Sequence, residues 1–170
     1  MAPPPFVVRR FEIGEAEALR RLRLLALRDT PEAFGKGYAQ DEARPLESWQ
    51  EWIATDAPFG AFVGTDPHSL AGFSRETAAN LAHRGKLGAM YVAPGLRGTG
   101  AAAALVGAVL QYARTCVEQV HLSVNVDNQR AVRFYRRMGF VEYGCEPAGL
   151  RYAGIAHDVL LMVRRLQPAD

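Results

Sequence analysis

Residues 92–105 read VAPGLRGTGAAAAL, and this stretch decides the fold. Three glycines and Arg97 stand between an apolar run at residues 87–92 and an alanine-rich segment that continues to Thr115. The apolar run predicts a strand, and the alanine-rich segment predicts a helix. A strand, a glycine-rich turn and a helix N-terminus in this order are typical of a phosphate site, because free amides and the helix dipole both favour an anion there.

Two familiar phosphate loops do not match this turn. A P-loop requires lysine followed by serine or threonine after its last glycine, whereas Ala101 and Ala102 follow Gly100 here. The dinucleotide fingerprint requires a further glycine three residues after Gly100, and its βαβ surroundings are also missing, since antiparallel strands are expected before the turn. What remains is RGTGAA at residues 97–102, which fits the pattern R-x-x-G-x-A.

The hydrophobic pattern predicts strands and helices along the whole chain. Strands are expected at residues 6–11, 60–65, 70–77, 87–92, 120–126, 140–145 and 156–166. Helices are expected at residues 14–27, 46–53 and 100–115, and from the potential caps Asp127 and Asn128 to Gly139. Residues 66–69, with sequence DPHS, are expected to form a hairpin turn.

A second motif lies at residues 128–140, which read NQRAVRFYRRMGF. It resembles the later motif of the GNAT superfamily of acyl-CoA-dependent N-acetyltransferases, N-x-x-A-x-x-x-Y followed by G-F, and RGTGAA resembles the pyrophosphate loop of that family. The order and separation of the motifs agree, and so does the order of elements over nearly all 170 residues. The resemblance implies an α/β (α+β) GNAT fold in one domain, residues 1–170. Its central sheet would be mixed and mostly antiparallel, with about seven strands flanked by about four helices and a splay between strands 4 and 5.

The resemblance implies acetyl-CoA as cosubstrate and no metal. Arg97 would supply positive charge, and the pyrophosphate would lie against the amides of Gly98, Thr99, Gly100, Ala101, Ala102 and Ala103. The pantetheine arm would lie in the splay, against Met90, Tyr91 and Val92. Asn128 would reach it with its side-chain amide, unless Asn128 is a plain helix N-cap.

Tyr135 is the general acid that the resemblance implies for the departing thiolate, unless it is only a packing residue like Phe134. The sequence offers three candidates for the general base. Many relatives carry a glutamate in the fourth strand, but residues 87–92 contain no acid. The candidates are Glu76, His83 and Glu32, each of which is otherwise a solvated surface side chain. His121 is expected to face either the cleft or the opposite helix layer, and His68 and His157 are expected to be turn or surface residues.

The resemblance places the acceptor near the first two helices and the segment that joins the last two strands, with Glu32, Phe34 and Tyr152 as candidate contacts. The acceptor would be a small-molecule amine or a protein amino group. Acidic residues that favour a polyamine weakly are Glu32, Asp41, Glu42 and Glu47. An alternative function is an acyl-CoA-binding sensor or partner subunit that has lost turnover, although the presence of Tyr135 favours an enzyme.

Composition excludes several other classes of function. The net charge is only +2, and no long run of like charge indicates nucleic-acid binding. The start, MAPPPFVVRR, does not resemble a signal peptide, and the apolar segment at residues 100–110 is too short to cross a bilayer. Two cysteines and four scattered histidines predict neither a disulfide framework nor a metal site, so a cytoplasmic protein is expected. Self-association into a homodimer stays open.

Overall fold

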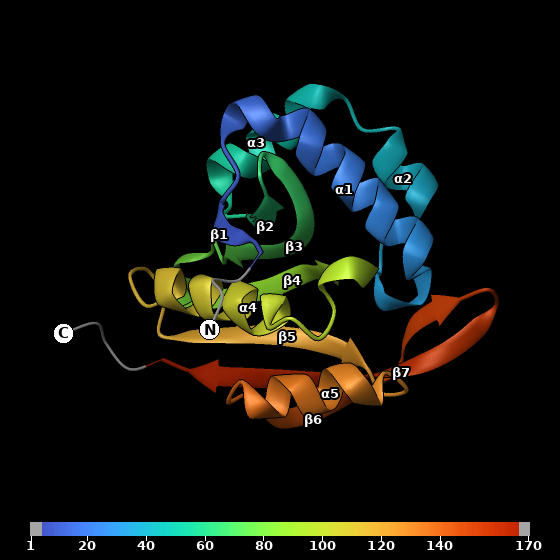
Figure 1. The fold of residues 1–170 in the computed structure, drawn as a ribbon. Helices are drawn as coiled ribbons and strands as arrows, with labels where there is room; N and C mark the ends of the chain where they lie inside the picture. Colours follow the sequence, from blue (N-terminus) through green and yellow to red (C-terminus); the bar gives the residue numbers. More distant parts are fainter. Residues whose placement is uncertain (1–4, 167–170) are drawn as a thin grey trace.

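The computed structural model describes residues 5–166, whose strands form one seven-stranded sheet in the order β1-β2-β3-β4-β5-β7-β6 (Figure 1). The strands are β1 (Val7–Arg10), β2 (Phe59–Val63), β3 (Asp66–Arg75), β4 (Arg84–Val92), β5 (Gln119–Asn125), β6 (Val141–Tyr152) and β7 (Ile155–Arg165). Neighbouring strands are antiparallel except for the parallel pair β4 and β5. The prediction of a mixed, mostly antiparallel sheet is confirmed.

Five α-helices lie within the described residues, one more than the sequence indicates. They are α1 (Ala16–Asp29), α2 (Tyr38–Glu42), α3 (Leu46–Thr55), α4 (Ala101–Ala113) and α5 (Gln129–Arg137). Four short 3-10 turns are η1 (Ile13–Glu15), η2 (Pro31–Ala33), η3 (Ala79–Leu81) and η4 (Pro94–Leu96). The additional helix α2 has only five residues, so the hydrophobic period had too few positions to indicate it.

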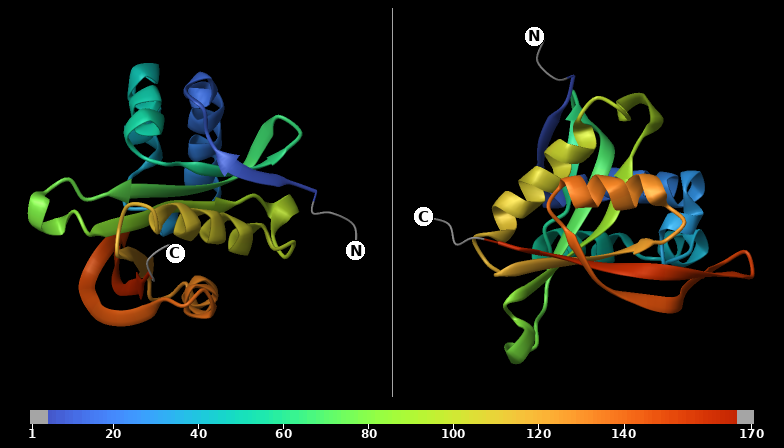
Figure 2. Two further views of the ribbon diagram at one scale, coloured as in Figure 1. Left: turned by 90° about the vertical axis from the view of Figure 1, so that its left-hand side faces the viewer. Right: turned by 90° about the horizontal axis from the view of Figure 1, so that it is seen from below.

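The helices form two layers, one on each face of the sheet (Figures 1 and 2). On one face, Leu19 and Leu22 of α1 pack in a cluster with Trp49 of α3. On the other face, Leu105 of α4 and Val132 of α5 belong to a second buried cluster. Burial of these apolar stripes holds the helices to the sheet, at about 25 cal/mol per Å² of apolar surface removed from water.

The sheet opens between β4 and β5, as predicted. These strands pair only where Arg84, Gly85 and Lys86 lie opposite Gln119, Val120 and His121. Beyond Lys86 the two strands separate, while β5 stays paired with β7 as far as Asn125. A Cβ atom at Gly85 would clash with the Phe73 ring, so glycine permits the close packing at the paired end.

A bulge interrupts β4 beside this opening. Leu70 pairs with Tyr91 and Gly72 pairs with Gly88, so two residues, Ala89 and Met90, lie opposite one residue of β3. Ala89 has a φ of +51°, which is unfavourable for a residue with a Cβ atom. The bulge takes backbone groups out of the β3–β4 ladder at the edge of the opening.

Two predicted boundaries are wrong. Val63 pairs with Asp66, so the β2–β3 turn consists of Gly64 and Thr65, and residues 66–69 belong to β3. Gly64 has a φ of +61°, as tight hairpin turns require. Strand β6 extends to Tyr152 instead of ending near residue 145, because an irregularity between Glu146 and Leu150 accommodates its proline and glycine.

Candidate functional site

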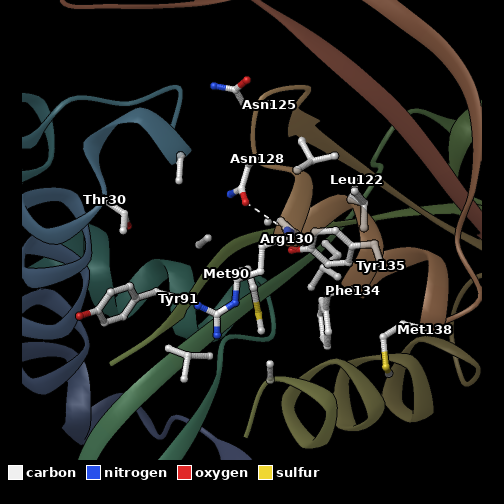
Figure 3. A pocket seen from close by; sticks show the side chains of 18 of the residues that line it. Thr30, Met90, Tyr91, Leu122, Asn125, Asn128, Arg130, Phe134, Tyr135 and Met138 are labelled. Carbon is white, nitrogen blue, oxygen red and sulfur yellow. Dashed lines mark hydrogen bonds between the residues drawn. The ribbon is translucent and has the colours of Figure 1, made fainter. Parts of the chain in front are cut away.

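A cleft of about 860 Å³ lies where β4 and β5 separate (Figure 3). Its walls come from β4, the turn before α4, β5, α5, the η2 segment and the start of β7. Among the residues that sequence analysis assigned to a cosubstrate or acceptor, the cleft is lined by Glu32, Phe34, Met90, Tyr91, Val92, Arg97, Gly98, Gly100, Ala102, Ala103, Asn128 and Tyr135. Residues that are far apart in the chain therefore meet in one cavity.

The turn before α4 is built to expose its amides. Gly98 and Gly100 have φ angles of +81° and +90°, and Gly100 is the N-cap of α4. No side chain in the described part of the protein caps this helix, and the N–H of Ala104 donates to the carbonyl of Gly100. The preceding amides of a helix have no intrahelical acceptor, so this N-terminus fits an anionic group such as a pyrophosphate.

Two residues of the predicted loop do not line the cleft. The hydroxyl of Thr99 donates to the carbonyl of Leu96 at 2.6 Å, and the side chain of Ala101 is fully buried in the core. The side chains of Thr99 and Ala101 therefore face the protein and not the cleft, and only their backbone groups remain available to a ligand.

Arg97 has a structural partner that the sequence did not indicate. Its Nη2 atom donates to Oδ2 of Asp29 at 2.7 Å, and its Nε atom donates to the carbonyl of Val92 at 2.9 Å. The Tyr91 hydroxyl donates to the same Asp29 oxygen at 3.1 Å. Burial and the Asp29 carboxylate raise the pKa of Tyr91. Sequence analysis also missed Arg130 and Arg137, which add positive charge to the cleft wall.

Asn128 has the helix-cap role considered for it in the sequence, and its contact with the cosubstrate stays a prediction. Its Oδ1 atom accepts a hydrogen bond from the N–H of Ala131 at 3.1 Å, so it caps α5 (Figure 3). Among residues 5–166 its Nδ2 atom has no hydrogen-bond partner, and the residue lines the cleft. The cap orients the amide, and its nitrogen is left to donate to a ligand.

Tyr135 lies on α5 beside Phe134 (Figure 3), and its ring packs edge-on against the rings of Phe134 and Phe140. Only 7% of the residue is exposed, yet it lines the cleft. Burial raises the pKa of its hydroxyl far above 10, so the phenol stays protonated at neutral pH. It is therefore a packing residue that also lines the cleft, and its role as general acid stays a prediction.

The structure does not bring Glu76 or His83 into the cleft. Glu76 donates its N–H to the carbonyl of Arg84 at 3.1 Å, and the carbonyl of His83 accepts from the N–H of Glu118 at 2.8 Å. Both contacts lie at the paired end of β4, and both side chains are exposed. His83 is seven residues from Met90, a span of about 23 Å along an extended strand. Neither Glu76 nor His83 lines the cleft, so no contact in the structure supports a direct role as base.

On the acceptor side, Thr30, Glu32 and Phe34 line the cleft, but Tyr152 does not and is exposed near the end of β6. Asp41 is 1% exposed and forms an ion pair with Arg23, Nε to Oδ2, at 3.0 Å. This carboxylate is already neutralised inside the protein, so the prediction that it belongs to an acidic wall for a polyamine is wrong.

The structure adds a histidine–aspartate pair that sequence analysis missed. His157 of β7 and Asp127, at the start of α5, both line the cleft, and Nδ1 of the imidazole lies 2.7 Å from Oδ2 of the carboxylate. The His157 side chain is 19% exposed, so the prediction of a turn or surface residue is wrong. No local sequence signal marks the pair, because it arises from the register in which Asn125 of β5 lies opposite Val159 of β7.

No helix among the described residues is long and apolar enough to cross a membrane. Within residues 5–166, no group of three or more histidine, cysteine, aspartate or glutamate side chains is arranged to hold a metal ion.

The fold, the loop and the cleft together are those of the GNAT class. A sequence model of the Acetyltransferase (GNAT) family matches residues 19–140, so the chain belongs to this family. Over 56 residues it is 50% identical to uncharacterised N-acetyltransferases of Mycobacterium bovis and Mycobacterium tuberculosis. That match covers 32% of this chain and 36% of the length of those relatives.

Solved structures share the whole fold at low sequence identity. A GNAT-family acetyltransferase from Streptococcus pneumoniae has a TM-score of 0.84 and 19% identity, over 95% of this chain and 99% of that one. The yncA protein of Salmonella typhimurium, solved with its cofactor acetyl-CoA, has a TM-score of 0.82 and 16% identity, over 97% and 96%. The spermidine N-acetyltransferase of Vibrio cholerae, in complex with CoA and spermine, has a TM-score of 0.75 and 19% identity, over 96% of each chain.

Proposed function

We propose that the protein transfers the acetyl group of acetyl-CoA directly to a primary amine of a small molecule or of a protein. One observation carries this proposal: the uncapped amides of α4, the bulged backbone of β4 and the protonated Tyr135 hydroxyl all meet in one cleft. The Salmonella typhimurium and Vibrio cholerae proteins, solved with acetyl-CoA and CoA, support the choice of cosubstrate.

The residues of the cleft fit acetyl-CoA along its length. The N-terminus of α4 would hold the pyrophosphate, with charge from Arg97 and from Arg130 of α5. The pantetheine arm, which carries amides of its own, would pair with the free backbone of β4 near Met90 and with Nδ2 of Asn128. When bound, this cosubstrate supplies an acetyl group activated as a thioester.

Transfer requires stabilisation of two developing negative charges. An N–H group of the β4 bulge near Met90 would donate to the carbonyl oxygen of the thioester, in the manner of an oxyanion hole. The Tyr135 hydroxyl would donate its proton to the departing sulfur. A cysteine-like thiol has a pKa of about 8.5, so a weak acid is sufficient, and general acid catalysis typically contributes about 10²- to 10⁴-fold.

The acceptor would enter beside η2, where Glu32 and Phe34 line the cleft. The exposed Glu32 carboxylate suits a cationic amine, and Phe34 offers an apolar surface for its alkyl chain. We place this activity in the cytoplasm, because Cys116 and Cys145 are both free thiols.

The test is a screen of amines for CoA release, followed with a thiol reagent. The panel contains spermidine, a peptide with a free N-terminal alanine, and a peptide whose only amine is a lysine side chain. Release of CoA with formation of one acetylated amine is expected. Calorimetry with acetyl-CoA runs in parallel, because tight binding without acetylation of any amine would identify a sensor instead of an enzyme.

A further inference from the structure

We propose that His157 is the general base of this acetyltransferase and that Asp127 is its positioning residue, an inference that rests on the proposed function. Direct transfer to an alkyl amine requires a base, since an amine with a pKa near 10.4 costs about 4 to 5 kcal/mol to deprotonate at pH 7. The fourth strand supplies no acid for this step.

The register of β7 places His157 on the side of the sheet opposite Tyr135. Side chains alternate along a strand, and β7 pairs with β5 without interruption from Val159 to Arg165. Leu160 and Met162 pack into the core beneath α4 and α5. Val159 and His157 therefore point to the other face, on the side of α1, whereas Tyr135 approaches from α5.

The two groups thus approach the opening between β4 and β5 from opposite faces, and both line the same cleft. This arrangement suits acyl transfer. The amine adds to the thioester carbonyl carbon to form a tetrahedral intermediate, which then expels the sulfur. A base on the acceptor face and an acid on the thiol face serve the two proton transfers separately.

Asp127 fixes the orientation of the imidazole. With Nδ1–H donating to Oδ2 of Asp127, the Nε2 lone pair of His157 is left for the amine. Asp127 is itself placed by local structure, because its N–H donates to Oδ1 of Asn125 at 2.9 Å and its carbonyl accepts from the N–H of Gln129 at 2.9 Å.

Other charged side chains line the same cleft as His157 and contribute to the electrostatic potential there. Glu32 of η2 is negative, and Arg97, Arg130 and Arg137 are positive. Glu32 is the rival candidate, but it is exposed, and among the described residues it forms no ion pair or side-chain hydrogen bond that would hold it in place. His157 differs from it in being half-buried and oriented by a carboxylate.

Nε2 of His157 accepts the proton that the ammonium must lose, and the neutral nitrogen attacks the carbonyl carbon to form the C–N bond. As the C–S bond breaks, Tyr135 protonates the sulfur. The second amine proton passes to solvent, and the phenolate regains a proton from solvent. The products are the N-acetyl amine and CoA thiol, and the proton on His157 passes to solvent.

The experiment compares H157Q with the wild-type protein and with H68Q, a control histidine that is exposed on β3 and outside the cleft. On the amine identified in the panel, H157Q should lower kcat/KM at pH 7 by about 10²- to 10⁴-fold. The deficit should shrink as pH rises, because the amine then loses its proton without help. The Kd for acetyl-CoA should not change, and H68Q should match the wild type.

Asp127 is tested by D127N, with D127E as the conservative variant. Two-bond proton–nitrogen NMR spectra should show the Nδ1–H tautomer of His157 in the wild type and its loss in D127N. D127N should lower kcat about tenfold with little change in KM, and D127E should recover most of the loss.

The inference is overturned if H157Q retains wild-type turnover, if its deficit does not depend on pH, or if E32Q shows the pH-dependent loss instead. An Nε2–H tautomer at His157 in the wild type overturns it as well. A wild-type protein that binds acetyl-CoA but acetylates no amine contradicts the proposed function itself, and the base assignment fails with it.

Discussion

Arg97, in the loop before α4, is bound to Asp29, the last residue of α1, with 2.7 Å between Nη2 and Oδ2. The contact joins the loop expected to hold a pyrophosphate to the helix that leads into the acceptor side of the cleft. Asp29 also accepts from the Tyr91 hydroxyl, so one carboxylate connects α1 to both β4 and the loop. The charge of Arg97 is therefore shared between a structural contact and any bound anion.

Because Asp29 and a bound anion compete for the Arg97 guanidinium, substitutions at Arg97 and at Asp29 should change the Kd for acetyl-CoA in opposite directions. R97A should raise the Kd for acetyl-CoA about tenfold, because a charge-assisted hydrogen bond is lost. D29N should lower the Kd about two- to fivefold, because the pair is about one-third exposed and competes only weakly for the guanidinium. Calorimetry at low and high salt measures both, and R97K serves as the charge-preserving control. Weaker binding in D29N would contradict the idea of competition.

The glycine at the start of α4 provides a second prediction. Gly100 has a φ of +90° and lines the cleft, so G100V places a branched side chain against the free amides and strains the backbone. Acetyl-CoA binding should be abolished. G95V is the matched control, since Gly95 also has open space around it but lies outside the cleft and is not among the positive-φ glycines. Unchanged affinity in G100V, measured by calorimetry, would refute the loop assignment.

Removal of the Tyr135 hydroxyl should affect turnover more than binding. Y135F retains the ring that packs against Phe134 and Phe140 but cannot protonate the thiolate. We expect kcat to fall by about 10²- to 10⁴-fold, while the Kd for acetyl-CoA changes little. Y112F removes a hydroxyl from α4, outside the cleft, and should be neutral. If kcat is the same in Y135F as in the wild type, Tyr135 is not the acid.

The burial of Tyr135 also predicts how stability depends on alkaline pH. Its pKa in the folded protein is raised above the ordinary value of 10.0, so the unfolded chain releases this proton at lower pH than the native protein does. The associated stability is complete below pH 10 and decreases above it, by at most about 1.4 kcal/mol per pH unit for this group. Urea unfolding from pH 8 to pH 11 should show a shallower decline in Y135F than in Y112F. Equal slopes would count against this effect.

The sequence anticipated the local geometry of the cleft where neighbouring residues build it. The turn from Gly98 to Ala103 presents its amides because glycines with positive φ lead directly into a helix. Asn128 and Tyr135 are seven residues apart, which is two turns of α5, and both line the cleft. In both cases the local backbone geometry already determines which groups lie together.

The sequence did not indicate positions that depend on how strands pair or on how helices pack. Glu76 and His83 are near the fourth strand in sequence, but the parallel pairing of Arg84–Lys86 with β5 leaves them at the paired end of the sheet. Asp41 is an acidic residue by its sequence, yet packing of α2 against α1 gives it Arg23 as a partner. Neither result follows from spacing along the chain.

The sequence by itself determined the family, the order of most elements, the phosphate-type turn and the face of α5 that carries Tyr135, because hydrophobic periodicity and glycine geometry are local properties. Only the tertiary structure decided that Asp29 binds Arg97, that Ala89 lies in a bulge, and that His157 lies beside Asp127 in the cleft. These features join residues 30 or more positions apart or depend on strand register. A shift of one residue in the register of β7 would turn His157 to the opposite face of the sheet.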